Sequence, residues 1–401
     1  MKCVILAAGE GKRARPLTFT KPKAMLPIAN KPIWEWNLLN AITAGLKEFI
    51  FVVGYKSEIV RDYFGNGEKW NVKIDYINQG NPFGTGHAIG LVEKFVKNFI
   101  VLCGDTIFES QDIIKIIKKE NCIGLVELED PREYGIVEIK GEKIIKIYEK
   151  LEDPFSNIIN AGIYHFNKKV FDFIRKTGKS QRGEYEITDS INMFLEKHEM
   201  EGIFLKKWRD VVYPWNLLDA NEEFLKKLNG KLEGLVEKNT TIKGEVFVGK
   251  NTKILSGSYI EGPVTIGGNC KIGPNCYIRP YTSIDDNCHI GNACEVKNSI
   301  IMSYSNIPHH NYVGDSIIGQ NCNLGSGAKI ANLRLDKRNI EVVLNGNKLN
   351  TNRSKLGTII GDNVQIGINS MLNVGSIIGN DVFVGPGTMV EGEVKPNAKI
   401  M

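Results

Sequence analysis

The chain has 401 residues, of which 42% are hydrophobic and 24% charged, and 51 Lys+Arg against 46 Asp+Glu give it a formal charge of +5. A balance this even does not indicate nucleic-acid binding, and the composition is too apolar for a mainly disordered chain. No apolar run reaches the roughly 18 residues of a membrane-spanning helix, and no signal peptide precedes the strand-like segment Met1–Leu6. We therefore expect a cytoplasmic protein of two domains that contacts neither membranes nor nucleic acid.

Residues 1–230 have the pattern of an α/β domain. Apolar runs such as Cys3–Ala8 and Phe99–Leu102 alternate with helix-like stretches such as Trp34–Ala44. This alternation predicts a Rossmann-like, mostly parallel sheet with helices packed on it. All five tryptophans precede residue 216, and Asn229-Gly230 ends the last helix-like stretch of this half, so we place the domain boundary at residue 230.

Residues 231–401 are periodic, with an apolar residue at every sixth position. Twelve hits in one phase run from Val236 to Met302; the phase slips at Pro308, resumes from Tyr312, and after an insertion continues to Val390. A period of six fits neither a helix nor a hairpin, but it fits a left-handed parallel β-helix in which three hexads make one triangular coil. The twenty-two hexads predict about seven coils.

Five of the eight cysteines lie two positions before the apolar residue of their hexad. They are Cys270, Cys276, Cys288, Cys294 and Cys322. Other hexads have Thr, Ser, Val or Ala at this position, which indicates a second inward row that takes small side chains. Cysteines six residues apart without a histidine pattern do not match the spacing of a zinc site. We interpret them as core residues.

A glycine turn follows the first strand, in the segment Leu6–Thr18. A turn of this kind lets backbone N–H groups approach phosphates, and Arg13, Arg15 and Lys23 supply the positive charge that a triphosphate requires. The dinucleotide fingerprint fails because Ala14 stands where it needs glycine, and the P-loop spacing is absent.

Asp105 follows another buried strand, at the edge where open α/β sheets bind ligands, and its carboxylate is suited to Mg²⁺.

The segment LAAGEGKRARPLTFTKPKAMLPI resembles the opening of the sugar-1-phosphate nucleotidyltransferases, and the resemblance extends over essentially the whole chain. It implies that Arg13 and Lys23 are catalytic and contact the phosphates. It assigns nucleotide binding to Leu6, Ala8, Gly9, Gly11, Gln79, Gly84 and Thr85, sugar-phosphate binding to Gly135, Glu149, Lys150 and Asn160, and Mg²⁺ binding to Asp105 and Asp210. The implied reaction is in-line attack of a sugar-1-phosphate on the nucleotide α-phosphorus, with pyrophosphate leaving. The second glutamine of the family falls at Pro82, which leaves UTP and dTTP both open.

The repeat is interrupted at 303–311 and 331–356, and interruptions of a strict rule are candidate sites. Arg-Pro, Glu-Val-Lys-Asn and His-x-x-Tyr occur there or just before, in the order found in the acetyltransferase half of bifunctional uridylyltransferase/glucosamine-1-phosphate acetyltransferases, which this half resembles. By this resemblance acetyl-CoA is the donor. His309 is the base, and Arg279, Lys297, Tyr312, Asn332 and Lys355 bind the amino-sugar phosphate. An imidazole suits proton removal from the attacking amine.

This half departs from the bacterial pattern at Asn332-Leu333-Arg334-Leu335, which makes Lys355 a looser assignment and points to the archaeal-type bifunctional enzymes, with galactosamine-1-phosphate as a further candidate substrate. The leading hypothesis is a bifunctional enzyme with UTP, sugar-1-phosphates and acetyl-CoA as substrates, which forms a homotrimer or larger homo-oligomer through its β-helix. A monofunctional uridylyl- or thymidylyltransferase with a structural β-helix is the alternative. A regulatory subunit is a third hypothesis, disfavoured by Arg13, Lys23, Asp105 and Asp210 together.

Overall fold

The computed structural model describes residues 1–401 except for the side chain of Ala7, and the chain forms two structural units. The first unit comprises residues 1–10, 22–25 and 33–210, and the second comprises residues 11–21, 26–32 and 211–401. The predicted phosphate-binding segment Leu6–Thr18 is therefore divided between the units. Its residues up to Glu10 belong to the first unit, and the part that carries Arg13 belongs to the second. Each unit is described by itself below.

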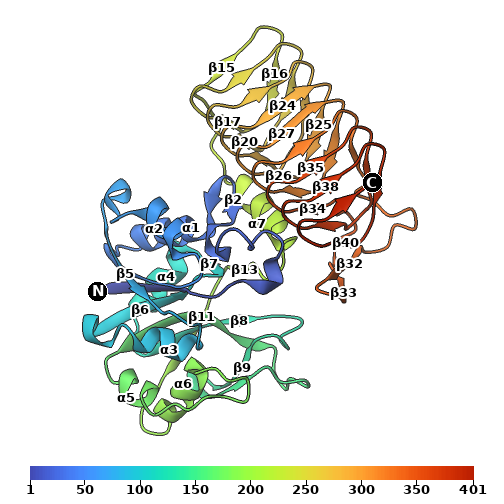
Figure 1. Cartoon of the computed structure of the whole chain (residues 1–401). Coiled ribbons are helices and arrows are strands. Elements are labelled where there is room, and N and C mark those ends of the chain that lie inside the picture. Colours follow the sequence, from blue (N-terminus) through green and yellow to red (C-terminus); the bar gives the residue numbers. More distant parts are fainter. The chain divides into compact units, whose positions relative to one another are not determined.

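A nine-stranded sheet organises the first unit (Figure 1). Its order is β5 (Lys73–Asn78), β4 (Glu48–Val53), β1 (Lys2–Ala7), β6 (Asn98–Cys103), β11 (Ile158–Asn167), β8 (Cys122–Glu127), β12 (Glu201–Phe204), β10 (Lys143–Glu149) and β9 (Gly135–Lys140). The first four strands are parallel, as the sequence predicted. From β11 onward, antiparallel pairs join the sheet. The central strands are almost wholly apolar because both faces are covered.

Helices cover both faces of this sheet. One face packs against α1 (Ile33–Thr43), α2 (Ser57–Phe64) and α4 (Ser110–Ile117), and the other against α3 (Thr85–Gly90), α5 (Val170–Ile174) and α6 (Ile187–Leu195). Trp34, Phe51 and Phe64 fill the first layer, with the Trp34 and Phe51 rings edge to face at 4.7 Å. A short pair, β7 (Thr106–Phe108) and β13 (Trp208–Asp210), lies apart from the main sheet.

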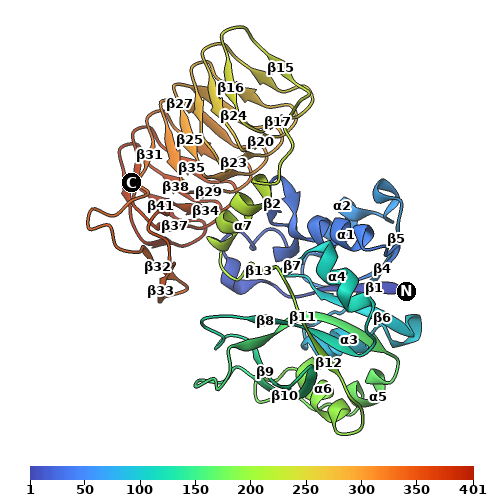
Figure 2. The ribbon, with the colours of Figure 1, turned by 180° about the vertical axis from the view of Figure 1, so that it is seen from behind.

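Three parallel sheets form the predicted left-handed β-helix in the second unit (Figure 2). The β14 sheet contains β14 (Lys231–Leu232), β17 (Val246–Val248), β20 (Val264–Ile266), β23 (Thr282–Ile284), β26 (Ile300–Ile301), β29 (Ile317–Ile318), β34 (Ile359–Ile360), β37 (Ile377–Ile378) and β40 (Glu393–Val394). The β15 sheet contains β15 (Leu235–Val236), β18 (Lys253–Ile254), β21 (Lys271–Ile272), β24 (His289–Asn292), β27 (Asn306–His309), β30 (Asn323–Leu324), β35 (Gln365–Ile366), β38 (Phe383–Val384) and β41 (Lys399–Ile400). The β16 sheet contains β16 (Thr241–Lys243), β19 (Tyr259–Glu261), β22 (Tyr277–Ile278), β25 (Glu295–Lys297), β28 (Tyr312–Gly314), β31 (Lys329–Ile330), β36 (Met371–Leu372) and β39 (Met389–Val390).

The β-helix is longer than the seven coils predicted, because two of its faces have nine strands and the third has eight. Three of the missed strands, β14, β40 and β41, lie at the ends, where the steps from Leu232 to Val236 and from Val390 to Val394 are four positions instead of six. The fourth, β27, continues the coil through the segment that the sequence suggested was a break. The five late cysteines are free, buried thiols in the β-helix core, as predicted.

At two positions of the β-helix core, the hexad pattern predicted the residue next to the one that the structure buries. Ile301, paired beside Ile284, fills the core position that we expected for Met302, and Val313 fills the one expected for Tyr312. The step from Val296 to Ile301 is five positions instead of six, and so is the step from Val313 to Ile318. Before the insertion at 331–356, which the structure confirms, the interruptions are therefore two shortened corners, and they leave Tyr312 on the outer side of its strand.

The outer side of the β14 sheet is covered within its own unit by α7 (Asn216–Leu225), β2 (Pro27–Ile28) and β3 (Lys31–Pro32) (Figures 1 and 2). Asn221 of α7 accepts hydrogen bonds from Ala29 N and Ser283 Oγ and donates one to Tyr281 O. These bonds, with Ile300 and Ile317 buried on that side, dock the segment 26–32 onto the coils.

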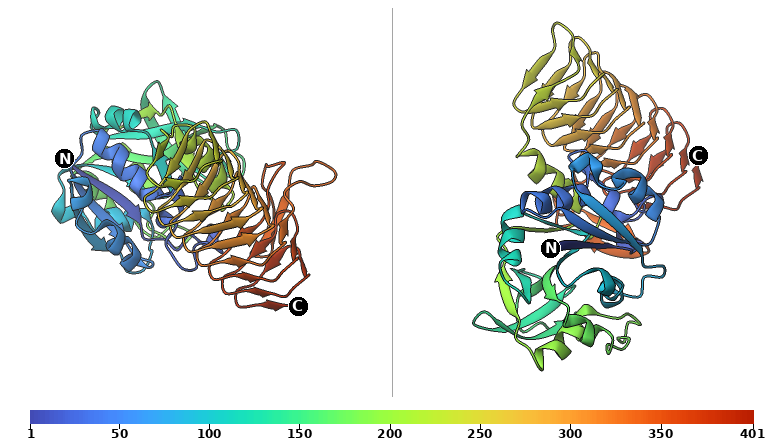
Figure 3. Two further views of the ribbon diagram at one scale, coloured as in Figure 1. Left: turned by 90° about the horizontal axis from the view of Figure 1, so that it is seen from above. Right: turned by 90° about the vertical axis from the view of Figure 1, so that its left-hand side faces the viewer.

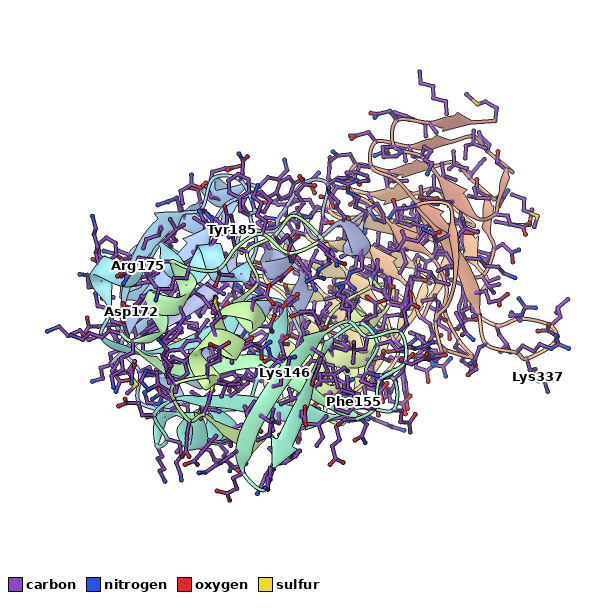
Figure 4. All side chains as sticks on the ribbon, turned by 90° about the horizontal axis from the view of Figure 1, so that it is seen from below. Lys146, Phe155, Asp172, Arg175, Tyr185 and Lys337 are labelled. Carbon is purple, nitrogen blue, oxygen red and sulfur yellow. The ribbon has the colours of Figure 1, made fainter. Side chains whose placement is uncertain are left out.

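The insertion after Ile330 first forms a loop that projects from the coils in Figure 3, and then an antiparallel hairpin of β32 (Glu341–Leu344) and β33 (Asn347–Asn350). Lys337 lies in the projecting loop before β32 in Figure 4, and Arg353, after the hairpin, pairs with Asp219 of α7. Among the described residues, no helix has the length and apolar character needed to cross a membrane.

Candidate functional sites

Lys23 lies between two carboxylates in the first unit. Its Nζ is 3.3 Å from Asp105 Oδ2 and 3.8 Å from Asp210 Oδ1. The fold explains the convergence, because Asp105 follows β6 and Asp210 of β13 pairs directly with Thr106, the next residue. Tyr134 donates a hydrogen bond to Asp210 Oδ2 at 3.1 Å. Three of the predicted phosphate and metal residues are thus brought together.

The pKa of the Cys103 thiol, at the end of β6, reflects the charges around Lys23. Burial raises the pKa of its thiol, and the carboxylates of Asp105, Asp210 and Glu149 raise it further. The thiol is therefore protonated and is a poor nucleophile. The same surplus of negative charge favours a bound cation.

The predicted base-reading segment is organised by Gln79 and α3. Gln79 is buried, and its Nε2 lies 3.0 Å from Gly84 O and 3.1 Å from His87 Nδ1, so the amide donates to both. Gly84 has φ of +105°, and a Cβ there would lie 2.6 Å from Tyr185 O, so no other residue fits this turn. Thr85 Oγ1 accepts a hydrogen bond from Ile187 N at 3.2 Å.

The predicted sugar pocket is formed where β9, β10 and β11 meet. Gly135 pairs in register with Glu149, and a Cβ on Gly135 would lie 3.5 Å from Glu149 Oε1 and 3.7 Å from the Cβ of Asn160. The glycine thus leaves open space in front of two polar side chains. Lys150 follows Glu149, with its Nζ 3.6 Å from Glu133 Oε2.

Glu149 is held by residues that sequence reasoning missed. Its Oε1 accepts a hydrogen bond from Thr188 Oγ1 at 2.9 Å, and Arg182 Nη2 lies 3.5 Å from Oε2. Burial raises the pKa of Glu149 despite these two partners. Thr188 and Arg182 are more than thirty residues away along the chain, and no motif marked them.

The turn that is predicted to bind phosphates falls in both units. In the first unit, β1 contains Leu6 and is followed by Ala8 and Gly9. A Cβ on Gly9 would meet nothing within 4 Å. In the second unit Gly11 has φ of +63° and precedes a 3₁₀ turn, Lys12–Ala14, that carries Arg13. Gly11 O accepts hydrogen bonds from Ala14 N at 2.9 Å and Thr18 Oγ1 at 2.9 Å, which closes the turn.

A second cluster lies on the outer side of the β16 sheet. Arg279 Nη1 lies 2.8 Å from Glu295 Oε1, and Glu295 pairs in register with Tyr312. Asn332 Nδ2 donates to the Tyr312 hydroxyl at 3.2 Å and to Asp315 Oδ2 at 2.5 Å. The structure therefore brings together three residues predicted for the acetyl site.

Lys297 joins this cluster through Asp315. Its Nζ is 2.9 Å from Asp315 Oδ2, and Asn298 Nδ2 donates to Oδ1 at 2.8 Å. Asp315 is 2% exposed and occupies one of the two shortened corners. A Cβ on Gly314, just before it, would lie 2.7 Å from Asn332 Nδ2 and from the Tyr312 hydroxyl, so a larger residue there would displace these two side chains. Asp315 was missed because one aspartate at a turn carries no distinctive pattern.

His309 and Lys355 lie at two edges of this cluster. His309 ends β27 in register with Asn292, and its carbonyl accepts a hydrogen bond from Gly327 N at 3.0 Å. Its ring is exposed at the corner before Tyr312. Lys355 forms an antiparallel bridge with Leu333, the neighbour of Asn332. His309 is thus three residues before Tyr312 along the chain, and Lys355 is bridged to the neighbour of Asn332; the roles of both side chains stay predictions.

Three family models match the chain. One described as "Nucleotidyl transferase" matches residues 2–227, one described as "GMPPB C-terminal domain" matches residues 260–345, and one described as "Bacterial transferase hexapeptide (six repeats)" matches residues 357–392.

Curated relatives match over nearly the full length. The protein named "Bifunctional protein GlmU" of Methanocaldococcus jannaschii is 40% identical over 400 residues, 99% of this chain and 96% of that one, and the one of Methanococcus maripaludis is 44% identical over 403 residues with the same shares. A "Bifunctional sugar-1-phosphate nucleotidylyltransferase/acetyltransferase" of Sulfurisphaera tokodaii is 40% identical over 98% of each chain.

Solved structures match the N-terminal part. A UDP-glucose pyrophosphorylase complexed with UDP-glucose is 25% identical with a TM-score of 0.52, over 56% of this chain and 98% of that one. A putative glucose-1-phosphate thymidylyltransferase from Bacillus anthracis is 30% identical with a TM-score of 0.53, over 58% and 97%.

Proposed function

Since the chain belongs to the family of bifunctional sugar-1-phosphate nucleotidyltransferase/acetyltransferases, we propose that it acetylates glucosamine-1-phosphate with acetyl-CoA and then transfers a uridylyl group from UTP to N-acetylglucosamine-1-phosphate. The chain is an enzyme, and both of its halves match transferase families. This favours two activities over a monofunctional nucleotidyltransferase or a regulatory subunit. We assign the two activities to residues 1–230 and 231–401, respectively.

One observation carries the proposal: each unit brings a lysine predicted to bind a phosphate together with further polar side chains, Lys23 with Asp105 and Asp210 in the first and Lys297 with Asp315 and Asn332 in the second. In the nucleotidyl site, Lys23 and Arg13 neutralise the phosphates while Gln79, Gly84 and Thr85 hold the base. The sugar phosphate is already ionised, so its attack on the α-phosphorus requires no general base. Glu149 and Asn160 bind sugar hydroxyls and align the attacking oxygen.

The residues beside Lys23 fit a bound Mg²⁺. Asp105 and Asp210 are hard oxygen donors that converge on one point, as the contacts of Lys23 indicate. When bound, the ion would neutralise charge on the phosphates. Lys23 lies beside both carboxylates and offsets their mutual repulsion.

In the acetyl site, Arg279 and Lys297 bind the phosphate of the amino sugar, and Tyr312, Asn332 and Lys355 complete the pocket. His309 removes a proton from the amine as its nitrogen attacks the thioester carbon, and coenzyme A leaves as the thiol. We further propose that the β-helix forms a homotrimer, because this cluster lies on an open face that a second subunit can complete.

His309→Ala tests the assignment of the second activity. We expect acetyl transfer to fall by at least about a hundredfold, since general-base catalysis contributes on that order, while pyrophosphate release is unchanged. Acetyl transfer is followed through free coenzyme A thiol. His310→Ala is the matched control and should retain activity. Equal activity of His309→Ala and wild type would contradict the role.

The substrates are tested by a matrix of UTP, dTTP, GTP and ATP against glucose-, galactose- and N-acetylglucosamine-1-phosphate, with pyrophosphate release as the readout. UTP with N-acetylglucosamine-1-phosphate should give the highest kcat/KM. A wild-type enzyme that transfers no acetyl group to glucosamine-1-phosphate or galactosamine-1-phosphate would leave only the monofunctional alternative.

A further inference from the structure

A buried aspartate of the β-helix binds the segment that carries Arg13. Asp362, at the corner after β34, is 3% exposed. Its Oδ2 accepts hydrogen bonds from Thr20 Oγ1 at 2.5 Å and Lys21 Nζ at 2.7 Å, and its Oδ1 accepts one from Gln320 N at 2.7 Å. Segment 11–21 and the β-helix belong to one structural unit, so this contact is internal to that unit.

The ion pair between Lys21 and Asp362 is almost wholly desolvated. The two side chains are 9% and 5% exposed. Removal of one partner from a buried pair leaves an uncompensated charge, which is strongly unfavourable, whereas replacement of both by apolar groups is often tolerated. Asp362 is itself fixed to the preceding coil through Gln320, so its carboxylate is a rigid anchor.

This anchor lies at one end of the phosphate-binding turn. The other end is closed by the hydrogen bond from Thr18 Oγ1 to Gly11 O, and Arg13 lies between the two. Lys21 is also only two residues before Lys23. A turn tied at both ends holds its cations with little freedom, and a displacement of about 1 Å in a reacting group can cost on the order of a hundredfold in rate.

We propose that Asp362 is a positioning residue for nucleotidyl transfer, acting through Thr20 and Lys21 on the turn that carries Arg13. Nucleotidyl transfer therefore depends on a side chain of the β-helix, although Asp362 itself touches no substrate. This inference rests on the proposed nucleotidyltransferase function.

The experiment measures both activities in the same preparations of the full-length protein. Asp362→Asn and Lys21→Met should each lower kcat for pyrophosphate release by roughly tenfold or more, with KM for the sugar phosphate and acetyl transfer unchanged. Asp381→Asn is the matched control, because it alters an exposed corner carboxylate one coil further along. The exchanged pair Lys21→Asp/Asp362→Lys should recover part of the loss.

The outcomes separate three cases. Full pyrophosphate release by Asp362→Asn overturns the inference and leaves the proposed function intact. Parallel loss of both activities with a lowered Tm in the single variants, without recovery in the exchanged pair, overturns it as well, because the contact is then purely structural. Absence of pyrophosphate release in the wild type with every nucleotide overturns the proposed function itself.

Discussion

Around Lys23, carboxylates outnumber cations. This surplus of negative charge affects the pKa of the neighbouring Cys103 thiol. Asp105, Asp210 and Glu149 all raise the pKa of the buried Cys103 thiol, and Lys23 is the cation that opposes them. Under the proposed function, a phosphate that enters this site would meet Lys23 and a cation held by the two aspartates. The proposal therefore divides charge neutralisation between a side chain and a bound ion.

Glu149 gives a pH-dependent prediction at the same scale. Burial raises its pKa, so on acidification it takes up a proton at a higher pH than an exposed glutamate does. The hydrogen-bond acceptor form is present above the pKa in the folded protein and is lost as pH falls through it. We expect KM for the sugar-1-phosphate to rise on acidification in this range.

The matched variant is Glu149→Gln, which cannot titrate. Its KM should be raised roughly tenfold or more at neutral pH, as for loss of a charged hydrogen bond, and should be flat where the wild-type KM rises. Glu152→Gln, at an exposed position nearby, should behave as wild type. An unchanged wild-type pH profile in Glu149→Gln would refute the assignment.

At the scale of elements, two shortened corners explain how the cluster on the β16 sheet is assembled. This cluster, called the acetyl cluster below, comprises Arg279, Lys297, Tyr312, Asp315 and Asn332. Losing one residue after Val296 and another after Val313 keeps the apolar residues inward while it brings Lys297 and Asp315 together. The corner residues Asn298 and Asp315 have φ of +44° and +50°, conformations that Asn and Asp adopt more readily than other side chains. The repeat therefore forms a site without interrupting its sheets.

The inward row of small residues can be tested at Cys276. Its Sγ donates to Gly291 O at 2.7 Å, burial raises its pKa to about 12, and Ser258 has the same position one coil earlier. Cys276→Ser should lower the free energy of unfolding by less than about 1 kcal/mol, because a hydroxyl makes the same bond. Cys276→Leu should cost roughly 1–3 kcal/mol through overpacking.

Denaturant unfolding measures both changes, and a thiol reagent should label Cys276 only in the unfolded protein. If Cys276→Leu were as stable as Cys276→Ser, the position would not be confined by its neighbours.

At the scale of the whole molecule, the face that carries the acetyl cluster also exposes apolar side chains. Along the β16 sheet, Tyr312 pairs with Lys329, Lys329 with Met371, and Met371 with Met389. Met371 is 50% and Met389 58% exposed. An apolar continuation of a functional face is typical of a subunit contact.

Met371→Lys/Met389→Lys tests this contact. We expect the double variant to be smaller in light scattering and to lose acetyl transfer, because a subunit interface excludes charge and the cluster then lacks its neighbour. Pyrophosphate release should be retained. Lys253→Glu, on the β15 sheet, is the control. A monomeric wild-type protein would refute the proposed trimer.

Periodic and local features of this protein were determined by sequence alone. The hexads predicted the β-helix, and the small-residue row explained the cysteines, because burial every sixth residue is a property of the chain itself. Short motifs likewise predicted roles for Lys23, Asp105, Gln79 and Tyr312, since each belongs to a contiguous segment, and these roles stay predictions.

Only the tertiary structure decided which distant residues hold those groups. Thr188 beneath Glu149, Asp315 beside Lys297 and Asp362 beneath Lys21 are single polar residues without a motif. The register of Ile301 and Val313 was also decided there, because a five-residue step and a six-residue step look alike when neighbouring positions are both apolar or aromatic. Such partners are selected by three-dimensional packing and by the need to satisfy buried charge, neither of which leaves a periodic trace in the sequence.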